Sequence, residues 1–263
     1  MNGGSPSGRR TPKKTKRARF GVFRAARRLR SLGGMPRIPR ALLVEPESAN
    51  HCIWRAHDGE RVFEAAGARA KFLELLARYK ERHSILLHSY CLMGTHPHVV
   101  CTSVQGQEEF SRFWKVVNHA FAWWFNRRHG RRGQVVMERV QSPRIQGGGG
   151  HQLTVMRYGD LNPVRAGLVR SPKDWRWSSY RHYAFGEPND LIDPAAEYLA
   201  LGRTPAERRN AYQNLFAIPL SAALTTRRPD LVALAFIGDA SWVSAKAEAA
   251  GLSTPRRPRA RDG

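Results

Sequence analysis

Acidic residues are absent from the first 40 positions, which contain 13 arginines and lysines. The rest of the chain has 31 basic and 21 acidic residues, so it contributes +10 to the net charge of +23. A basic bias in overall composition explains part of the preference for arginine over lysine, but not the whole excess of basic residues. The remainder predicts a polyanionic partner, and nucleic acid is the first candidate. Residues 1–35, rich in Gly, Ser and Pro as well, are predicted to form a disordered basic arm.

Cysteines and long apolar runs are also scarce. The three cysteines, Cys52, Cys91 and Cys101, are odd in number and lack metal-type spacing, so they predict buried thiols in a reducing cytoplasm. No apolar run approaches the roughly 18 residues of a membrane span. The basic N-terminal segment has no apolar stretch behind it, which argues against a secretory signal. The expected location is therefore cytoplasmic, near the nucleoid of a bacterium, with no membrane partner.

The periodicity of apolar residues predicts alternating strands and helices. Strands are expected at 50–56, 84–93, 96–103 and within 133–146, and helices at 67–83, 107–130 and 151–161. The order strand, helix, strand, strand, helix, strand is typical of the ferredoxin-like, split βαβ arrangement. The predicted fold is therefore α+β, an antiparallel four-stranded sheet with helices on one face.

Three segments are expected along the chain: the basic arm 1–35, a main domain at 36–188, and a helical extension with a basic tail at 189–263. In the extension, Thr204 followed by Glu207 predicts a capping box at the start of a helix. A further helix is expected at 241–251. The helix from 151 is expected to stop near Asn162, because the residue before a proline avoids the α-helical conformation.

Two pairs of polar residues have spacings that suit chemistry. His96 and His98 stand two apart on a strand, so both rings face the same side and offer a pair of metal ligands. Tyr158 and Asn162 stand four apart on a helix and share a face. Neither pair is decisive alone, because such histidines also occur as structural pairs and such tyrosines as packing residues.

Four motifs, taken together and in order, resemble one known family. They are "HSYCLMGTHPHVV" (88–100), "WFNRRHGRRG" (124–133), "YGDLNPVRAGLV" (158–169) and "DWRWSSYRHY" (174–183). These segments are similar to the histidine-hydrophobic-histidine segment, the helix-to-strand passage, the tyrosine helix and the following motif of the single-tyrosine, HUH-type transposases. The version with "NPVRAG" resembles the REP-associated tyrosine transposases, and the resemblance covers about residues 36–185.

The resemblance implies a metal-dependent endonuclease and strand transferase that acts on single-stranded or hairpin DNA. Tyr158 matches the nucleophile, His96 and His98 match the histidine ligands, and Asn162 stands at the third ligand position. The implied metal is Mg²⁺ or Mn²⁺, the implied covalent intermediate is a 5′-phosphotyrosine, and the implied assembly is a monomer or a homodimer. The predicted DNA contacts are Arg165, which suits a carboxylate or a phosphate, and the pair Arg127 and Arg128.

The sequence also departs from the family pattern. Pro97 stands where the family has an apolar residue, Gly159 follows the tyrosine, and the segment 137–152 with its four glycines differs most. A domesticated or decayed protein that binds hairpin DNA with little cleavage is therefore the alternative. A ferredoxin-like RNA-binding module ranks last, because the strand "HPHVVCTS" lacks the expected aromatic pattern.

Overall fold

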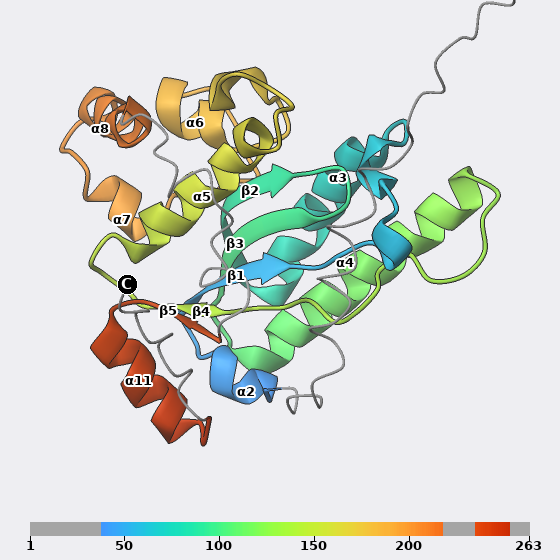
Figure 1. Ribbon diagram of the computed structural model, residues 1–263, viewed down its shortest axis with the longest axis horizontal. Helices are drawn as coiled ribbons and strands as arrows, with labels where there is room; N and C mark the ends of the chain where they lie inside the picture. Colours follow the sequence, from blue (N-terminus) through green and yellow to red (C-terminus); the bar gives the residue numbers. More distant parts are fainter. Residues whose placement is uncertain (1–37, 218–234, 253–263) are drawn as a thin grey trace, which may run out of the picture. The chain divides into compact units, whose positions relative to one another are not determined.

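A computed structural model describes residues 38–217 and 235–252, which belong to one compact unit (Figure 1). The predicted arm and basic tail lie outside the described residues. The strands are β1 (Ala49–Ile53), β2 (Ile85–Leu92), β3 (Pro97–Ser103), β4 (Arg144–Ile145) and β5 (Phe236–Ile237). The α-helices are α2 (Arg40–Leu43), α3 (Ala68–Lys80), α4 (Gln107–Arg128), α5 (His151–Arg165), α6 (Tyr180–Phe185), α7 (Ala196–Leu199), α8 (Pro205–Ala217) and α11 (Ala240–Ala249). Short 3₁₀ turns are η1 (His57–Gly59), η2 (Val62–Glu64), η3 (Glu81–His83) and η4 (Pro172–Asp174).

The strands form one sheet in the order β2-β3-β1-β4-β5. The pairs β2–β3, β3–β1 and β1–β4 are antiparallel, and the order of these four strands is that of a split βαβ arrangement. The prediction of four strands was wrong by one, because β5 from the C-terminal extension pairs in parallel with β4. The sheet therefore has five strands and is mixed. The fourth strand is also shorter than expected, with two residues.

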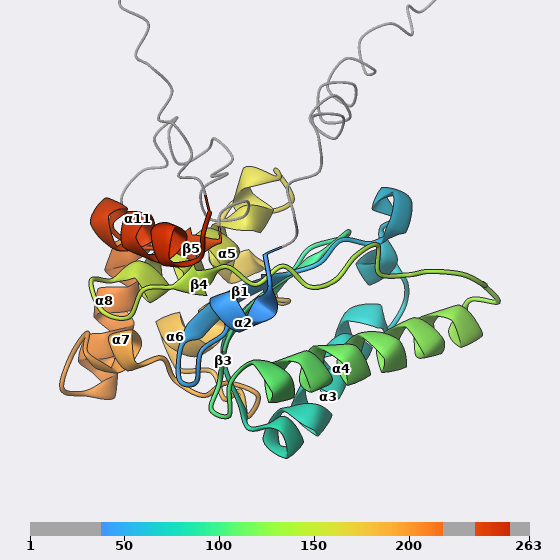
Figure 2. The same ribbon diagram turned by 90° about the horizontal axis from the view of Figure 1, so that it is seen from below.

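The helices cover both faces of the sheet, so the prediction of helices on one face was wrong (Figure 2). Neighbouring residues of a strand point to opposite faces. On β1, the Cys52 thiol contacts Trp114 of α4, whereas the ring of the preceding residue, His51, lies against Tyr158 of α5. Helices α3 and α4 therefore cover one face, and α5 covers the other.

The face under α3 and α4 contains the main aromatic core. The rings of Trp54, Phe63, Phe72 and Phe121 contact one another at centroid distances of 5.2 to 6.0 Å, and all four side chains are buried. The apolar stripe of α4 is buried here as well: Phe110, Trp114, Val117, Phe121 and Phe125. All three cysteines are buried and carry free thiols, as the sequence predicts.

Pro97 is compatible with a central strand because it is the first residue of β3. It pairs with Leu92 of β2, whose N–H donates to the Trp177 carbonyl and not across the ladder. On the other side, the pairing between β1 and β3 ends at Ile53 and His98. A proline at the first position of a strand costs no ladder bond inside the sheet. Pro97 therefore does not disrupt the strand that carries His98, and His96 and His98 keep their places on either side of it.

Helix α5 continues to Arg165, so the predicted stop near Asn162 was wrong. Pro163 lies inside the helix and lacks the N–H that would bond to the Gly159 carbonyl. The turn after it is nevertheless closed, since the N–H of Ala166 donates to the Asn162 carbonyl at 2.9 Å. Tyr158 and Asn162 therefore lie on one continuous helix, as the four-residue spacing requires.

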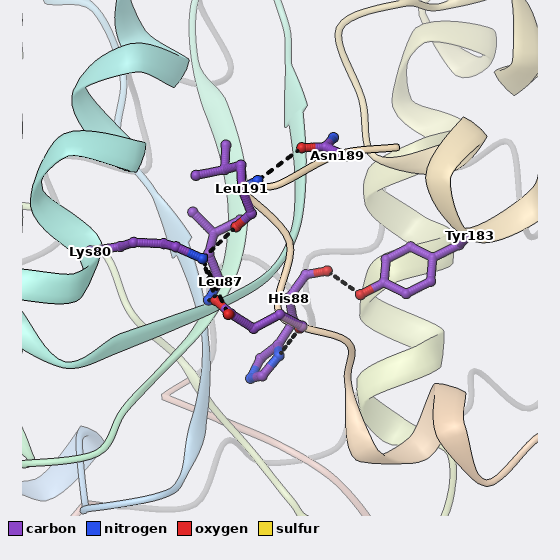
Figure 3. Close-up of polar contacts among 7 residues, drawn as sticks. Lys80, Leu87, His88, Tyr183, Asn189 and Leu191 are labelled. Atoms are coloured by element: carbon purple, nitrogen blue, oxygen red, sulfur yellow. Dashed lines mark hydrogen bonds and ion pairs between the residues drawn. The ribbon is translucent and has the colours of Figure 1, made fainter. Parts of the chain in front are cut away.

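The C-terminal extension closes the outer edge of β2 through a polar network (Figure 3). Lys80 Nζ lies 3.0 Å from Asp193 Oδ2 and donates to the Leu191 carbonyl. The same carboxylate accepts the Leu87 N–H at 2.8 Å, and the backbone of Asp193 bonds back to Leu87 and His88. Residues 191–193 thus satisfy a strand edge that would otherwise expose unpaired backbone groups.

Removing the Asp193 carboxylate is expected to destabilise the protein. The Lys80 side chain is buried, and Asp193→Ala leaves its charge without its partner, at a cost of about 2–4 kcal/mol in the free energy of unfolding. Urea unfolding followed by circular dichroism measures the loss. The control is Glu74→Ala, which breaks exposed pairs with Lys71 and Arg78 and is expected to cost less than about 1 kcal/mol. Equal losses for the two variants would contradict the role of this network.

Candidate active site

Two histidines from neighbouring strands meet on the α5 face of the sheet. His51 of β1 and His98 of β3 are offset by two residues in the register, which lets their side chains touch diagonally. His51 Nε2 lies 3.1 Å from His98 Nδ1, and both rings are buried. The His98 Nε2 atom is buried and has no hydrogen-bond partner. One nitrogen of His98 is therefore fixed by His51, and the other is left for a ligand.

Burial lowers the pKa of His98 well below its ordinary value, and the nearby His96, His51, Arg55 and Arg165 add to this effect. A neutral imidazole at neutral pH has a lone pair on one nitrogen, which is the form that binds a metal. The second nitrogen of such a ligand usually donates to a neighbouring group that fixes the ring. His51 stands in that position.

His96 lies just before β3, and its ring centroid is 4.8 Å from that of His98. Its Nδ1 atom is 2.8 Å from the hydroxyl of Thr95, the residue before it. The two predicted histidine ligands are thus brought together, and each has a bonded Nδ1 atom.

Tyr158 lies against the same histidines from α5. Its ring centroid is 5.8 Å from that of His98 and 6.2 Å from that of His51, in both cases edge to face. The guanidinium carbon of Arg165 stands 4.7 Å above the tyrosine ring. The predicted nucleophile and the predicted phosphate contact are therefore neighbours. Tyr158 is 8 % exposed, and its hydroxyl forms no hydrogen bond with another described residue.

Asn162 lies one helical turn after Tyr158, and its Nδ2 atom is buried without a hydrogen-bond partner. Within residues 38–217 and 235–252, no three His, Cys, Asp or Glu side chains are grouped so that they could hold a metal ion. A metal at this site would therefore need the amide of Asn162 beside His96 and His98. The buried, unpartnered Nε2 of His98 fits such a ligand set.

Arg127 and Arg128 are not part of this cluster. They end α4, which covers the opposite face of the sheet from α5. Both side chains are exposed, and Arg127 stacks on the ring of Trp123 at 5.5 Å. Any contact of these arginines with DNA is a contact on a separate surface.

Asp160 lies on α5 two residues after Tyr158, and its side chain is buried in the interior. It is 1 % exposed and accepts a hydrogen bond from the Tyr212 hydroxyl of α8 at 2.7 Å. Burial raises the pKa of Asp160 to about 7, against the opposing effect of hydrogen bonds from Tyr212 and Ser178. The extension is thereby bonded to the helix that carries Tyr158.

Tyr212→Phe is expected to loosen this attachment. The variant keeps the buried ring and removes one of the two hydrogen bonds that the buried Asp160 carboxyl group accepts, which costs about 1–3 kcal/mol. Thermal or urea unfolding measures the change. The matched control is Tyr79→Phe on α3, a partly buried tyrosine for which no hydroxyl hydrogen bond is observed, and it is expected to change little. A Tyr212→Phe protein as stable as the wild type would contradict the attachment.

No protein-family model and no curated protein matches the sequence. The chain is similar to one solved structure, that of a REP-associated tyrosine transposase bound to a REP hairpin. The match covers 58 % of this chain and 92 % of the transposase, with 17 % sequence identity and a TM-score of 0.43.

Among the described residues, no helix is both long and apolar enough to cross a membrane.

Proposed function

We propose that the protein is a metal-dependent single-stranded DNA endonuclease and strand transferase with Tyr158 as the nucleophile. The observation that carries the proposal is the contact of the Tyr158 ring with His98, whose Nε2 atom is buried and unpartnered. The motifs "THPHVV" and "YGDLNPVRAG", which resemble those of REP-associated tyrosine transposases, supply these two side chains from two distant segments.

In the proposed reaction, the Tyr158 oxygen attacks a backbone phosphorus atom of the DNA. The new bond joins the tyrosine oxygen to phosphorus, and the bond between phosphorus and the 3′ oxygen breaks. The phenol loses its proton and the departing 3′ oxygen gains one, so a 5′-phosphotyrosine and a free 3′-hydroxyl result. The covalent intermediate retains the bond energy that rejoining to another strand requires.

The residues around Tyr158 suit a phosphodiester. Arg165 lies over the tyrosine ring and Arg55 lies close enough to affect His98, so positive charge surrounds the site. Charge that builds on phosphate oxygens during the displacement is stabilised by such fixed cations. A divalent cation held by His96, His98 and Asn162 would supply further stabilisation of that charge.

The ligand types favour one metal over another. An amide oxygen and water suit Mg²⁺ and Mn²⁺ alike, whereas imidazole nitrogen is the ligand that the harder Mg²⁺ ion accepts less readily. Of the two metals that the family resemblance implies, we therefore propose Mn²⁺. The proposed substrate, a single strand at the foot of a hairpin, follows from the same resemblance and agrees with the basic charge of the chain.

A second candidate is a protein that binds hairpin DNA with little cleavage. It is favoured by the 8 % exposure of Tyr158, since a nucleophile must reach its phosphate. The two candidates differ in one product. The full chain is incubated with hairpin oligonucleotides labelled on either side of the foot, with Mn²⁺ or with a chelator, and run on a denaturing gel. A protein-linked label on the strand 3′ of the cut, formed only with the metal, supports the transferase; hairpin binding without any adduct supports the second candidate.

A further inference from the structure

Helix α4 presents an outward column that the proposed reaction does not use. Lys115, His119, Trp123 and Arg127 follow one another at intervals of four residues, so they lie above one another on one side of the helix. All four side chains are exposed. At 1.5 Å per residue, the column is about 18 Å long. It lies on the face of α4 that points away from the buried stripe, which contains Phe121 and Phe125.

Trp123 is the unusual member of the column. It is 61 % exposed, whereas the next residue, Trp124, is partly buried against the core. The guanidinium of Arg127 covers one side of the indole, with its central carbon 5.5 Å from the ring centroid. Tryptophan is a frequent contact residue at interfaces, because a large rigid ring gains much from being covered. An indole kept in water beside a cation therefore indicates a binding surface.

The charge around Trp123 has one sign. Residues 110–137 include no aspartate or glutamate. Arg112 and Arg131 of this segment are paired with glutamates from elsewhere. By contrast, no ion pair joins Lys115, Arg127, Arg128 or Arg132 to any residue in the described part of the chain. These four side chains, with Trp123 among them, form a surface of uncompensated positive charge.

This charge decides between partners. A second copy of the chain that docked through the same surface would bring like charges together, which disfavours a symmetric dimer here. A partner with regularly spaced negative charges fits the column. A flat, exposed indole adds a preference for a partner with unpaired aromatic rings, since a duplex keeps its bases stacked on each other. Cations along a backbone path combined with an aromatic platform are the features of single-strand binding.

We propose that the α4 column binds single-stranded DNA, with a base stacked on Trp123 and phosphates held by Lys115, Arg127 and Arg128. The proposal relies on the proposed function only for the choice of DNA as the nucleic acid. It places this contact on the opposite face of the sheet from Tyr158, so the column acts as an anchor for a strand and takes no part in its cleavage. Arg127 thus has a second role, because it orients the indole as well as meeting a phosphate.

The test measures the affinity of the full chain for a short, fluorescently labelled oligothymidylate that forms no hairpin. Trp123→Ala is expected to weaken binding about 5- to 150-fold, the effect of losing one stacked base. Trp123→Phe keeps an aromatic platform and is expected to recover most of that loss. The double variant Arg127→Gln and Arg128→Gln is expected to lower the salt slope by about 1.4, from about 0.7 for each phosphate contact.

The control removes the same charge elsewhere. Arg78 and Arg82 are exposed on α3 and η3, and the corresponding double glutamine variant is expected to leave the Trp123-dependent binding unchanged. All variants alter exposed side chains, so circular dichroism spectra should match that of the wild type. The proposal is overturned if Trp123→Ala binds as tightly as the wild type. It is also overturned if the control weakens binding as much, or if Trp123→Ala weakens a blunt duplex as much as the single strand.

The measurement is independent of cleavage. If the wild type forms no covalent adduct while Trp123→Ala weakens oligothymidylate binding as expected, the proposed reaction fails and the α4 surface stands. If the adduct forms but the Trp123 variants bind normally, the reaction stands and the surface fails.

Discussion

Tyr158→Phe is expected to abolish the covalent adduct between protein and DNA completely. The substitution removes one oxygen atom, the only part of the side chain that the proposed reaction uses. The ring remains, so its contacts with His98 and His51 and its position under Arg165 are kept. The hydroxyl forms no hydrogen bond with a described residue, and its loss should leave the free energy of unfolding nearly unchanged. A denaturing gel with an end-labelled hairpin oligonucleotide and Mn²⁺ measures the adduct.

The matched control for this variant is Tyr180→Phe. Tyr180 is the next tyrosine in the chain after Tyr158. It is buried, and it is the first residue of α6, within the last of the four motifs. No hydroxyl hydrogen bond is observed for it among the described residues, so its variant should fold and form the adduct like the wild type. Tyr183 is a poorer control, because its hydroxyl donates to the His88 carbonyl. An adduct in the Tyr158→Phe protein would show that another residue is the nucleophile.

Much of the fold could be predicted because it depends on local periodicity. The helix of 107–130 was expected from its apolar spacing, and it forms at Gln107–Arg128 with that stripe buried. The capping box also forms as predicted, since the Glu207 N–H bonds to the Thr204 hydroxyl and the Glu207 carboxylate to the Thr204 N–H. Such signals are contained within a few residues, and tertiary contacts only reinforce them.

The errors concern features that depend on distant residues. β5 pairs with a strand more than 90 positions earlier, and a two-residue strand has no periodicity to detect. Helix α5 passes through Pro163, where packing of its buried face against the sheet outweighs the local preference of proline. Asp160 is polar, and its interior position becomes intelligible only through Tyr212, 52 residues away. No local pattern encodes these contacts.

The candidate site shows the same division. His96 and His98 could be paired from their spacing, and Tyr158 and Asn162 from theirs. His51 belongs to none of the four motifs, although it bonds directly to His98. Its role depends on the register between β1 and β3, which places His51 opposite Val100 and diagonal to His98. A polar residue inside a predicted strand was the available signal, and the register was the missing information.

The second large effect is expected on metal affinity, when His98 or His51 is replaced. His98→Gln is expected to abolish measurable Mn²⁺ binding, because the buried Nε2 atom is the proposed ligand and glutamine offers no imidazole. His51→Phe keeps a ring beside His98 and removes the hydrogen bond to its Nδ1 atom. Loss of such an orienting partner typically lowers metal affinity about 10- to 100-fold, so His51→Phe should bind Mn²⁺ weakly while His98→Gln does not bind.

Isothermal titration with Mn²⁺ measures both affinities without any need for cleavage. His119→Phe is the control, because His119 is exposed on α4, on the other face of the sheet, and its variant should bind as the wild type does. Unfolding curves check that the two buried substitutions leave a folded protein. Wild-type affinity in the His98→Gln protein would mean that the metal binds elsewhere. Wild-type affinity in His51→Phe alone would mean that the hydrogen bond between the two rings serves packing and does not orient a ligand. The graded result, no binding for His98→Gln and weakened binding for His51→Phe, is the one that a ligand held in place by a second histidine requires.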